Sequence, residues 1–378
     1  MEIETIKNNS GVKWKMVKLG EVVDIKNGRD HKKVNNVNGQ YPIIGSGGIM
    51  GYADDFLCEG NATIIGRKGS INNPIYIESR FWNVDTAFAL CPKKEIEPKF
   101  FYYFCTTYNF AKHNKATTLP SLTKTDLLEI QIPLPPLPVQ KRIAEILDAA
   151  DALRRKDQEL LKKYDELAQA IFIDMFGDPV KNEKGWEVKL FGELFDTRLG
   201  KMLDAKKQVG NTKYKYLGNS NVQWFRFQLE DLAEMEFEEK DLSTFELKDG
   251  DILICEGGEV GRSAIWRGEK EDIYFQKAIH RARAKSQNIT SEYTVMLFWF
   301  YAKFGGLKDF VTTSTISHLT GEKLKTIPIP VPPISLQVKF DNLILGQKKL
   351  VGQRSSNLSS SLFQTLLQKA FKGELVAE

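Results

Sequence analysis

The chain has 378 residues, enough for two or three domains of the usual size, with 42% hydrophobic and 27% charged residues. This composition excludes a disordered, collagen-like or purely coiled-coil chain. Its 53 Lys and Arg residues against 49 Asp and Glu residues give a formal net charge of +4. That charge permits nucleic-acid binding without requiring it.

The sequence has no feature typical of a secreted or membrane protein. The longest apolar run, residues 295–302, is far shorter than the roughly 20 residues that span a bilayer, and residues 1–7 lack the order of a signal peptide. We therefore expect a cytoplasmic protein with no membrane contact. The four cysteines are Cys58, Cys91, Cys105 and Cys255. None forms a CxxC pair, so we expect reduced, packed thiols rather than a zinc ribbon or a disulfide framework.

An internal duplication organises the chain. Residues 14–28 (WKMVKLGEVVDIKNG) return as residues 186–200 (WEVKLFGELFDTRLG), and residues 132–140 (IPLPPLPVQ) return as residues 329–337 (IPVPPISLQ). The order is therefore unit, helix, unit, helix. We predict an N-terminal extension in residues 1–13, a first unit in 14–136, a first long helix in 137–178, a second unit in 179–333 and a second long helix in 334–378.

The signals within each unit are mainly those of short strands. Apolar segments such as 41–44, 62–65 and 251–254 are separated by Gly, Asn and Asp turns. Two shorter helices, at 98–108 and 292–304, carry aromatic stripes that we expect in the core. The predicted fold class is α+β, with two duplicated mixed α/β units separated by two long antiparallel helices that form a coiled coil with pseudo-two-fold symmetry.

Apolar side chains repeat on a three-then-four spacing in both long helices, which is typical of a seam for another helix. A proline-rich hinge, residues 133–138 or 328–333, precedes each helix and sets its exit angle. A lone helix would expose its stripe, so we expect the two helices to pair. The expected pairing residues are Ile143, Ile146, Leu153, Leu160 and Leu167 in the first helix and Phe340, Leu343, Leu350, Leu358 and Leu362 in the second.

No catalytic constellation is present in the sequence. A P-loop, an HExxH zinc motif and a GxSxG elbow are all missing, and residues 45–51 (GSGGIMG) have Met50 where a dinucleotide fingerprint requires its third glycine. The run 73–76 (NPIY) is one residue away from the motif with which amino-methyltransferases hold a flipped base, but no cofactor loop accompanies it. We predict no catalytic, cofactor-binding or metal-binding residues in this chain.

Both units instead contain loops rich in basic and amide side chains, a composition suited to phosphates and base edges. An acidic stretch, residues 230–251, must then face away from DNA in the second unit. Solvated loops are the alternative interpretation, although recurrence in both units favours a function. The candidate DNA-binding residues are Arg29, Lys32, Lys33, Arg67, Lys68, Asn72, Lys112, His113, Lys115, Asn219, Asn221, Arg226, Arg262, Lys277, His280, Arg281 and His318. The residues expected at phosphates are Arg29, Lys68 and Lys112, and those expected at the base-reading surface are Asn221, Arg226 and His280.

The duplicated motifs resemble those of a known family. Each unit opens with Trp and Gly-Glu (Trp14 with Gly20, Trp186 with Gly192) and closes with the Pro-Pro and Gln motif before a long helix. Over nearly the whole chain this pattern resembles the specificity subunit of type I restriction–modification systems. Residues 135–147 (PPLPVQKRIAEIL) are especially similar to the family's first helical region. The second copy departs from the pattern at residues 334 and 335, where Ile-Ser replaces Leu-Pro.

That resemblance implies a non-catalytic subunit with two target recognition domains that each read half of a split sequence in double-stranded DNA. The helices would space these domains and help to dock methyltransferase (M) subunits, which carry S-adenosylmethionine and methylate adenine N6. Restriction and translocase (R) subunits that use ATP and Mg complete such enzymes, so no cofactor is expected in this chain. The alternative is a non-enzymatic adaptor with two protein- or glycan-binding modules on a helical hairpin. Binding to DNA that weakens steeply with salt would distinguish the two.

Overall fold

The computed structural model describes residues 6–7, 13–114, 120–202, 213–311, 318–353 and 356–376. Its contacts divide the chain into two compact units: unit 1, residues 1–159 with 354–378, and unit 2, residues 160–353. The sequence predicts the long helices as segments of their own, whereas the contacts assign part of the first helix to each unit. Among the described residues, no helix is long and apolar enough to cross a membrane.

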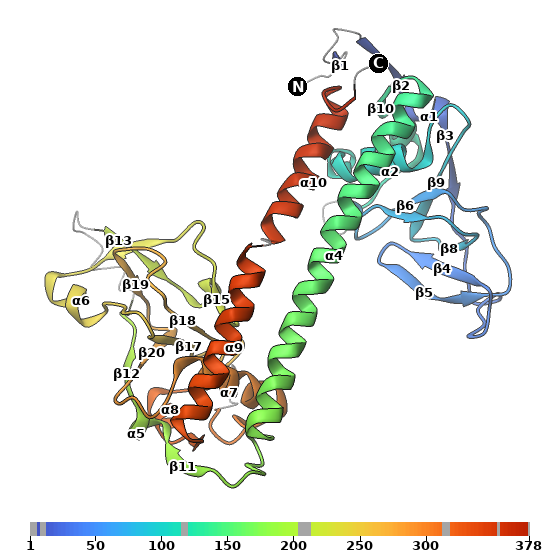
Figure 1. Cartoon of the computed structure of the whole chain (residues 1–378). Coiled ribbons are helices and arrows are strands. Elements are labelled where there is room, and N and C mark those ends of the chain that lie inside the picture. Colours follow the sequence, from blue (N-terminus) through green and yellow to red (C-terminus); the bar gives the residue numbers. More distant parts are fainter. Residues whose placement is uncertain are drawn as a thin grey trace. The chain divides into compact units, whose positions relative to one another are not determined.

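Unit 1 is built around two small sheets (Figure 1). A four-stranded antiparallel sheet has the order β3 (Val23–Asn27), β9 (Ala87–Pro92), β6 (Ala62–Gly66) and β7 (Ile75–Ile77), and a three-stranded sheet has the order β5 (Gly48–Ala53), β4 (Tyr41–Gly45) and β8 (Trp82–Asn83). A third sheet joins β1 (Ile6–Lys7), β2 (Lys13–Lys18) and β10 (Gln131–Leu134). The helical elements are α1 (Leu19–Val22), α2 (Pro98–Thr107), η1 (Phe110–His113) and α3 (Lys124–Leu128).

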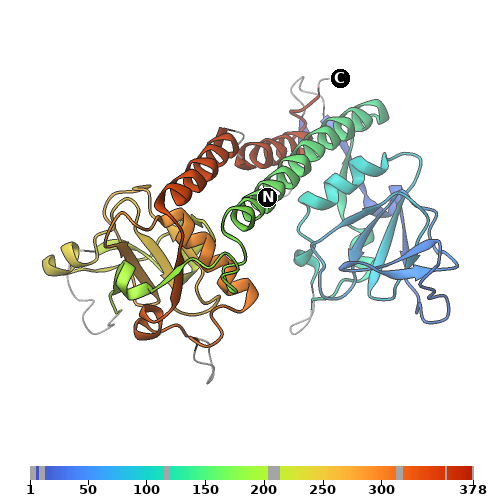
Figure 2. The same cartoon turned by 60° about the horizontal axis from the view of Figure 1, so that its bottom comes forward.

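Helix α2 is the centre of the unit 1 core. Its N-terminus is marked by Pro98 in the first turn and by Glu97, whose side chain accepts a hydrogen bond from the Phe100 amide. Helix α2 lies between the sheet and the long helices (Figure 2). Its aromatic rings are buried in the core, where Phe100 packs 5.3 Å from the Phe371 ring. The predicted aromatic stripe of this helix is therefore in the core.

Unit 2 repeats these two sheets in the same order. Its four-stranded sheet is β12 (Phe195–Leu199), β20 (Ile279–Ala284), β17 (Ile252–Cys255) and β18 (Ser263–Ile265), and its three-stranded sheet is β16 (Glu234–Glu236), β13 (Lys213–Leu217) and β19 (Ile273–Phe275). Two strand pairs complete it: β11 (Glu187–Leu190) with β21 (Pro328–Val331), and β14 (Val222–Gln223) with β15 (Arg226–Phe227). The helical elements are α5 (Phe191–Leu194), η3 (Asn219–Asn221), α6 (Glu239–Thr244), α7 (Ser291–Phe304) and α8 (Gly321–Lys325).

The strand pairings show that the sequence duplication is a duplication of structure. In unit 1 the one parallel pair within the described strands joins β4 to β8, and in unit 2 the corresponding parallel pair joins β13 to β19. All other pairings between the described strands are antiparallel. The predicted α+β class with two mixed units is confirmed.

The long helices contribute to both cores. Helix α4 (Leu137–Phe176) packs in unit 1 beside α10 (Ser356–Phe371) and in unit 2 beside α9 (Ile334–Gln353). In unit 2 the Gln347 side chain bonds the Tyr164 carbonyl, and the ring of Phe172 lies 5.5 Å from that of Phe340. From Tyr164 to Phe172 along α4, the partner on α9 changes from Gln347 back to Phe340, so the two helices are antiparallel.

The buried stripe of these helices is partly different from the predicted one. Ile143 and Phe340 are buried, and Ile146 and Leu160 are half-buried. The remaining predicted residues, which are Leu153, Leu167, Leu343, Leu350, Leu358 and Leu362, are exposed. In several places the buried side chain is the next residue along: Ala168, Ile344 and Phe363. One residue corresponds to a rotation of about 100° on a helix, so the prediction found the helices but chose a neighbouring face for much of their length.

In unit 1, a charged cluster on α4 makes the contact with α10 that was expected of Leu153. Asp151 is buried on α4 and accepts hydrogen bonds from Arg154 and Arg155. Burial alone would raise the pKa of Asp151, but these two guanidinium groups lower it. The Arg154 guanidinium also lies 5.3 Å from the centre of the Phe363 ring on α10, so a cation–π contact holds the helices together there.

A buried glutamine joins each proline hinge to its unit. The Gln140 side chain donates to Pro135 O at 2.8 Å and Glu95 O at 3.2 Å, and it accepts from the Glu97 amide at 2.8 Å. Gln337 repeats all three bonds in unit 2, with Pro332 O, Asn288 O and the Thr290 amide. The Gln of the duplicated motif therefore fixes the start of the long helix against the cap of α2 or α7.

We expect Gln140→Leu to destabilise unit 1. The substitution leaves one buried amide and two carbonyls without their partner, at a cost of about 1–3 kcal/mol for each group left unsatisfied. For a unit of this size, that corresponds to a melting temperature lower by roughly 5 °C or more. The matched control is Gln131→Leu, because Gln131 is exposed on β10. Equal melting of the two variants by differential scanning calorimetry would contradict the assigned role of Gln140.

Candidate nucleic-acid interface

Loops of unit 1 meet at one end of its four-stranded sheet. The Arg67 amide, just after β6, donates to Thr86 O at 2.8 Å between β8 and β9. The Gly69 amide donates to Pro120 O at 3.0 Å, and the Leu122 amide donates to Arg67 O at 2.9 Å. Because these bonds link segments that are far apart in sequence, they gather the loop side chains at a single end of the unit.

The loop after β3 belongs to the same end. The Arg29 amide donates to Asn83 O at 2.9 Å, and the Trp82 indole donates to Arg29 O at 3.2 Å. Gly28 has no room for a side chain, since a Cβ atom there would lie 1.8 Å from Val84 O. This close approach of two backbones fixes where Arg29 leaves the sheet.

Five of the predicted residues of unit 1 lie on these loops with exposed side chains. They are Arg29, Arg67, Lys68, Asn72 and Lys112. The Asn72 amide group donates to Asn109 Oδ1 at 3.0 Å, which joins the loop after β6 to the segment that carries η1. A hollow of about 410 Å³ lies between these segments, lined by residues that include Asn72 and Asn114. Amide side chains thus line the hollow, and the cations lie on the adjoining segments, a combination that can contact both base edges and phosphates.

The other predicted residues of unit 1 have different environments. Lys32 and Lys33 are exposed in the loop that follows Arg29. His113 is half-buried, and its ring bonds the Tyr108 hydroxyl at 2.6 Å. Lys115 lies outside the described residues.

The corresponding end of unit 2 has the same backbone bonds with different side chains. The Glu256 amide donates to Ala278 O at 2.9 Å and the Leu319 amide donates to Glu256 O at 2.8 Å, so Glu256 takes the place that Arg67 has in unit 1. The Lys201 amide donates to Phe275 O at 3.0 Å, so Lys201 takes the place of Arg29. The two units thus share this pattern of backbone hydrogen bonds, a common frame, but differ in the loop side chains that the frame positions.

Three predicted residues of unit 2 lie on this frame. Lys277 and His318 are exposed, and the Lys277 amide donates to Lys201 O at 2.9 Å. Asn219 is half-buried, and its side-chain amide donates to Gly257 O at 3.0 Å, next to the bridge between Gly257 and His318. The duplicated motif also places Lys201 directly after Gly200, as it places Arg29 after Gly28, but the Lys201 side chain is only 19% exposed and its ammonium pairs with Asp241.

The structure corrects the predicted placement of His280 and Arg281. His280 is only 1% exposed on the inner strand β20, where its ring bonds Leu319 O at 3.0 Å, and burial lowers its pKa. Arg281 is 6% exposed; its guanidinium reaches Glu246 O at 3.2 Å and Asp196 at 3.5 Å. Both side chains belong to the interior of unit 2 and are not at a base-reading surface.

Arg262 and Asn221 also have internal partners. The Arg262 guanidinium, which is largely buried, donates to Asn219 O at 2.8 Å. The Asn221 side chain accepts from the Gly218 amide at 2.8 Å and donates to Gln228 O at 3.0 Å, so both ends of its amide are used. These two residues shape the loop around Asn219 instead of presenting their polar groups to solvent.

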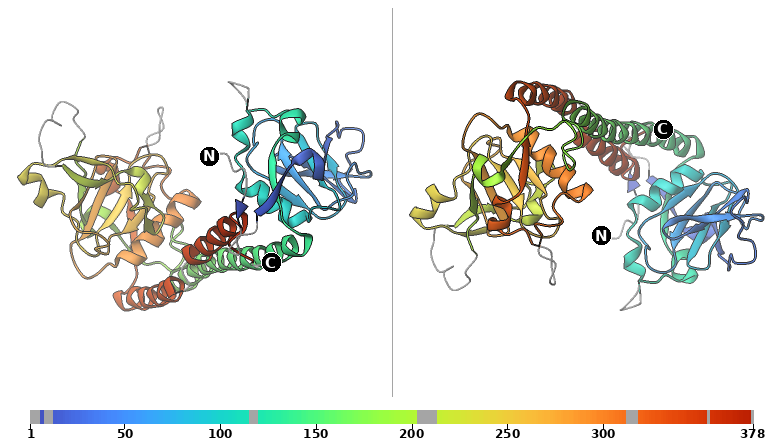
Figure 3. Two further views of the ribbon diagram at one scale, coloured as in Figure 1. Left: turned by 90° about the horizontal axis from the view of Figure 1, so that it is seen from above. Right: turned by 90° about the horizontal axis from the view of Figure 1, so that it is seen from below.

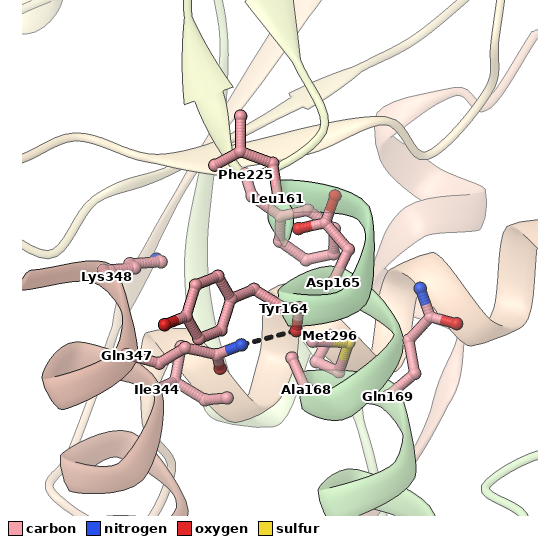
Figure 4. A pocket seen from close by; sticks show the side chains of 10 residues that line it. All are labelled: Leu161, Tyr164, Asp165, Ala168, Gln169, Phe225, Met296, Ile344, Gln347 and Lys348. Atoms are coloured by element: carbon pink, nitrogen blue, oxygen red, sulfur yellow. Dashed lines mark hydrogen bonds between the residues drawn. The ribbon is translucent and has the colours of Figure 1, made fainter. Parts of the chain in front are cut away.

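Arg226 lies beside helix α4 in unit 2. The turn before it contains Phe225, whose φ of 65° is rare for an aromatic residue. The Phe225 side chain lines an apolar pocket of about 250 Å³ with Met296 and residues of α4 and α9 (Figure 4). Burial raises the pKa of Asp165 in this pocket, and the nearby Arg226 charge opposes that effect. Arg226 itself is exposed on β15, and its role in reading bases stays a prediction.

The acidic stretch 230–251 is partly neutralised by unit 2 itself. Helix α6, within this stretch, lies at the outer margin of the unit (Figure 3), and Asp241 on it pairs with Lys201. Asp251 is buried and accepts two hydrogen bonds of 2.7 Å from Arg283. Asp241 nevertheless borders the loop end of the sheet, so the acidic stretch does not face away from that end as a whole.

In the part of the chain that the structure describes, no group of three or more His, Cys, Asp or Glu residues could hold a metal ion. The four cysteines are free thiols, three of them buried. The arrangement that the structure does show, basic and amide loops on a repeated frame, defines a class of two-unit recognition proteins.

Comparison with known proteins identifies the family. The model of the type I restriction modification DNA specificity domain matches residues 11–163 and again residues 183–340. The chain therefore belongs to the family of type I restriction–modification specificity proteins, and its role is recognition of DNA sequence without catalysis. The duplicated motifs had already indicated this family, and the prediction is confirmed.

Relatives and a solved structure agree with this assignment. The chain is 25% identical to a Haemophilus influenzae protein named "Putative type I restriction enzyme specificity subunit", over 99% of this chain and 97% of that protein. It is 24% identical to the MjaIX specificity subunit of Methanocaldococcus jannaschii, over 83% of this chain and 76% of that one. The crystal structure of the S subunit from M. genitalium has a TM-score of 0.63 at 18% identity, covering 97% and 99% of the two chains, and so has the same fold.

Proposed function

We propose that unit 1 and unit 2 each read one half of a gapped, bipartite target in double-stranded DNA, and that helix α4 sets the distance between the halves. The observation that carries this proposal is the shared backbone frame with different loop side chains. Arg67 and Lys68 in unit 1 correspond to Glu256 and Gly257 in unit 2. Two copies of one fold with unlike loops are suited to two different half-sequences.

We further propose that the protein acts with methyltransferase and restriction subunits, which supply S-adenosylmethionine, ATP and Mg. Support for this division of labour comes from the sequence, which has neither a P-loop nor a cofactor loop. The exposed leucines of the long helices, such as Leu153 and Leu350, provide apolar surface for such subunits. An adaptor for proteins or glycans is the alternative function, and the family match does not favour it.

The first test concerns phosphate contacts. We expect Lys68→Ala to weaken binding to specific and non-specific DNA alike and to lower the slope of log K against log salt by about one unit. The matched control is Lys94→Ala. Lys94 is exposed just beyond the end of β9 at Pro92, whereas the interface loops join β9 at its opposite end, beside Thr86.

Fluorescence anisotropy with labelled duplexes across a salt series measures both quantities. The control variant should retain the salt slope of the native protein. If Lys68→Ala and Lys94→Ala change the slope equally, the loop end of unit 1 is not the DNA interface. If the native protein binds DNA with no salt dependence, the adaptor function gains support instead.

A further inference from the structure

Unit 1 has a cluster of exposed apolar side chains on its edge hairpin. Strand β5 is at the edge of the three-stranded sheet, and its residues Ile49 and Met50 are each 62% exposed. Tyr52 on the same strand is 44% exposed, and Val37, next to the Asn36 amide that bonds Tyr52 O, is 88% exposed. An exposed edge strand with several large apolar side chains is a liability that soluble proteins usually avoid, which points to a contact made here.

The hairpin tip lies beside the cationic loops of the interface. A Cβ atom on Gly66, the residue before Arg67, would lie 3.2 Å from Ser46 Cβ in the hairpin turn. A Cβ atom on Gly45 would lie 2.5 Å from Met50 Sδ and 3.5 Å from a Val84 methyl. The Met50 side chain therefore lies across β4 towards β8, the strand whose other side holds the loop of Arg29.

The glycines of the turn leave space for a close approach. Gly48 needs to be glycine for its φ of 115°. Gly47 has no such need: its φ is not in the left-handed region, and a Cβ atom there would meet nothing within 4 Å. Among the residues of unit 1 that the structure describes, no neighbour requires a glycine at position 47, whereas a nucleic-acid backbone that passes close to the turn would require one.

We propose that the β4–β5 hairpin enters the major groove of the half-site read by unit 1 and that Met50, with Ile49 beside it, contacts the 5-methyl group of a thymine. This inference rests on the proposed DNA interface and names a specificity-determining contact within it. The major groove admits a two-stranded ribbon, and the thymine methyl is the apolar group displayed there. Cations on the neighbouring loops favour DNA over an apolar protein surface as the partner.

Unit 2 provides a contrast within the same chain. At the corresponding end of β13, the segment after Gly218 is η3, with Asn219, Ser220 and Asn221 in place of the glycine turn. The edge strand that corresponds to β5 is β16, where Met235 is buried between Glu234 and Glu236. The proposed contact is therefore specific to the half-site of unit 1. Thymines in the other half-site serve as an internal control.

The experiment uses the full chain with its methyltransferase partner and a duplex that carries the target determined by methylation mapping. Each thymine is replaced singly by deoxyuridine, which removes only the methyl group. We expect one position in the unit 1 half-site to weaken binding about fourfold, the value for burial of one methyl at about 0.8 kcal/mol. Met50→Ala should abolish that sensitivity and leave the response to deoxyuridine in the other half-site unchanged. Val180→Ala, at another exposed apolar residue, should behave as the native protein.

The outcomes separate this inference from the proposed function. Specific binding of the native complex without any sensitivity to deoxyuridine in the unit 1 half-site would overturn the thymine contact alone. The same conclusion holds if the sensitivity persists in Met50→Ala, or if that variant instead loses its methyltransferase partner, which would make the hairpin a protein-docking surface. Failure of the native complex to bind a gapped target at all would overturn both.

Discussion

Exchange of the loop-bearing part of unit 1 for that of a related protein is expected to change one half of the methylated target and leave the other half intact. The duplicated motifs suggest residues 14–132 for this exchange. The structure favours residues 19–130 as the segment to exchange. Strands β2 and β10, which flank this segment, pair with each other, and the Leu19 amide donates to Ile130 O at 2.8 Å, so the two ends of the segment are adjacent. The chain then keeps its own β2–β10 strand pair and its own long helices, while all loops of unit 1 at the interface end are replaced.

The readout is the methylation pattern of genomic DNA in cells that contain the exchanged chain and the methyltransferase subunit. The replaced half should take the sequence read by the donor protein. The control is the reciprocal exchange of residues 191–327, which are bounded in unit 2 by the equivalent bond from the Phe191 amide to Ile327 O at 2.9 Å. A change in both halves after a single exchange, or in the wrong half, is incompatible with one unit for each half-site.

Insertion of seven residues after Glu159 is expected to lengthen the gap of the target without changing either half. Helix α4 has 40 residues, about 60 Å at 1.5 Å per residue, and seven more add about 10 Å, equivalent to roughly three base pairs. One heptad keeps the buried stripe approximately in phase. Bending of DNA can absorb part of the added length, so the expected shift is about one to three base pairs.

A second insertion, between the end of α9 at Gln353 and the start of α10 at Ser356, should be made in the same chain. This second insertion keeps α10 in contact with the first half of α4, where the Arg154 guanidinium lies over the Phe363 ring. An insertion of seven residues at the exposed turn around Glu271, between β18 and β19 in unit 2, is the control that should leave the gap unchanged. If a folded complex with the lengthened helix methylates the original gap, α4 does not set the distance.

The duplication could be predicted from the sequence because its repeated segments are recognisable by direct comparison, without knowledge of the fold. The repeated Trp and Gly-Glu segments and the repeated proline hinges define two units and two helical regions. The same comparison identifies Lys201 as the counterpart of Arg29, since each directly follows its glycine, but it does not show the ion pair of Lys201 with Asp241. What the repeat does not show is the purpose of the Gln in the hinge motif, because two of its three partners, Glu95 and Glu97, belong to a segment distant in sequence.

The positions of individual side chains were predicted less well, for two physical reasons. On α4, α9 and α10, leucines occupy more than one face, and the packed face is chosen by partners such as Phe363 that carry no local signal. In β20, the sequence IHRARA suggests a solvated basic strand, but the segment at Leu319 covers His280 and the segment at Glu246 covers Arg281. Exposure of a cation depends on the layers that cover it, and these are properties of the tertiary structure.

The central claim, that two copies of one frame read two halves of a gapped sequence, is tested most directly by mapping adenine methylation across a genome in cells that express this chain with its methyltransferase subunit. We predict a single bipartite motif, with two specified segments separated by a gap of fixed length and unspecified sequence. A continuous motif, or a methylation pattern that is unaffected by deletion of this chain, would contradict it.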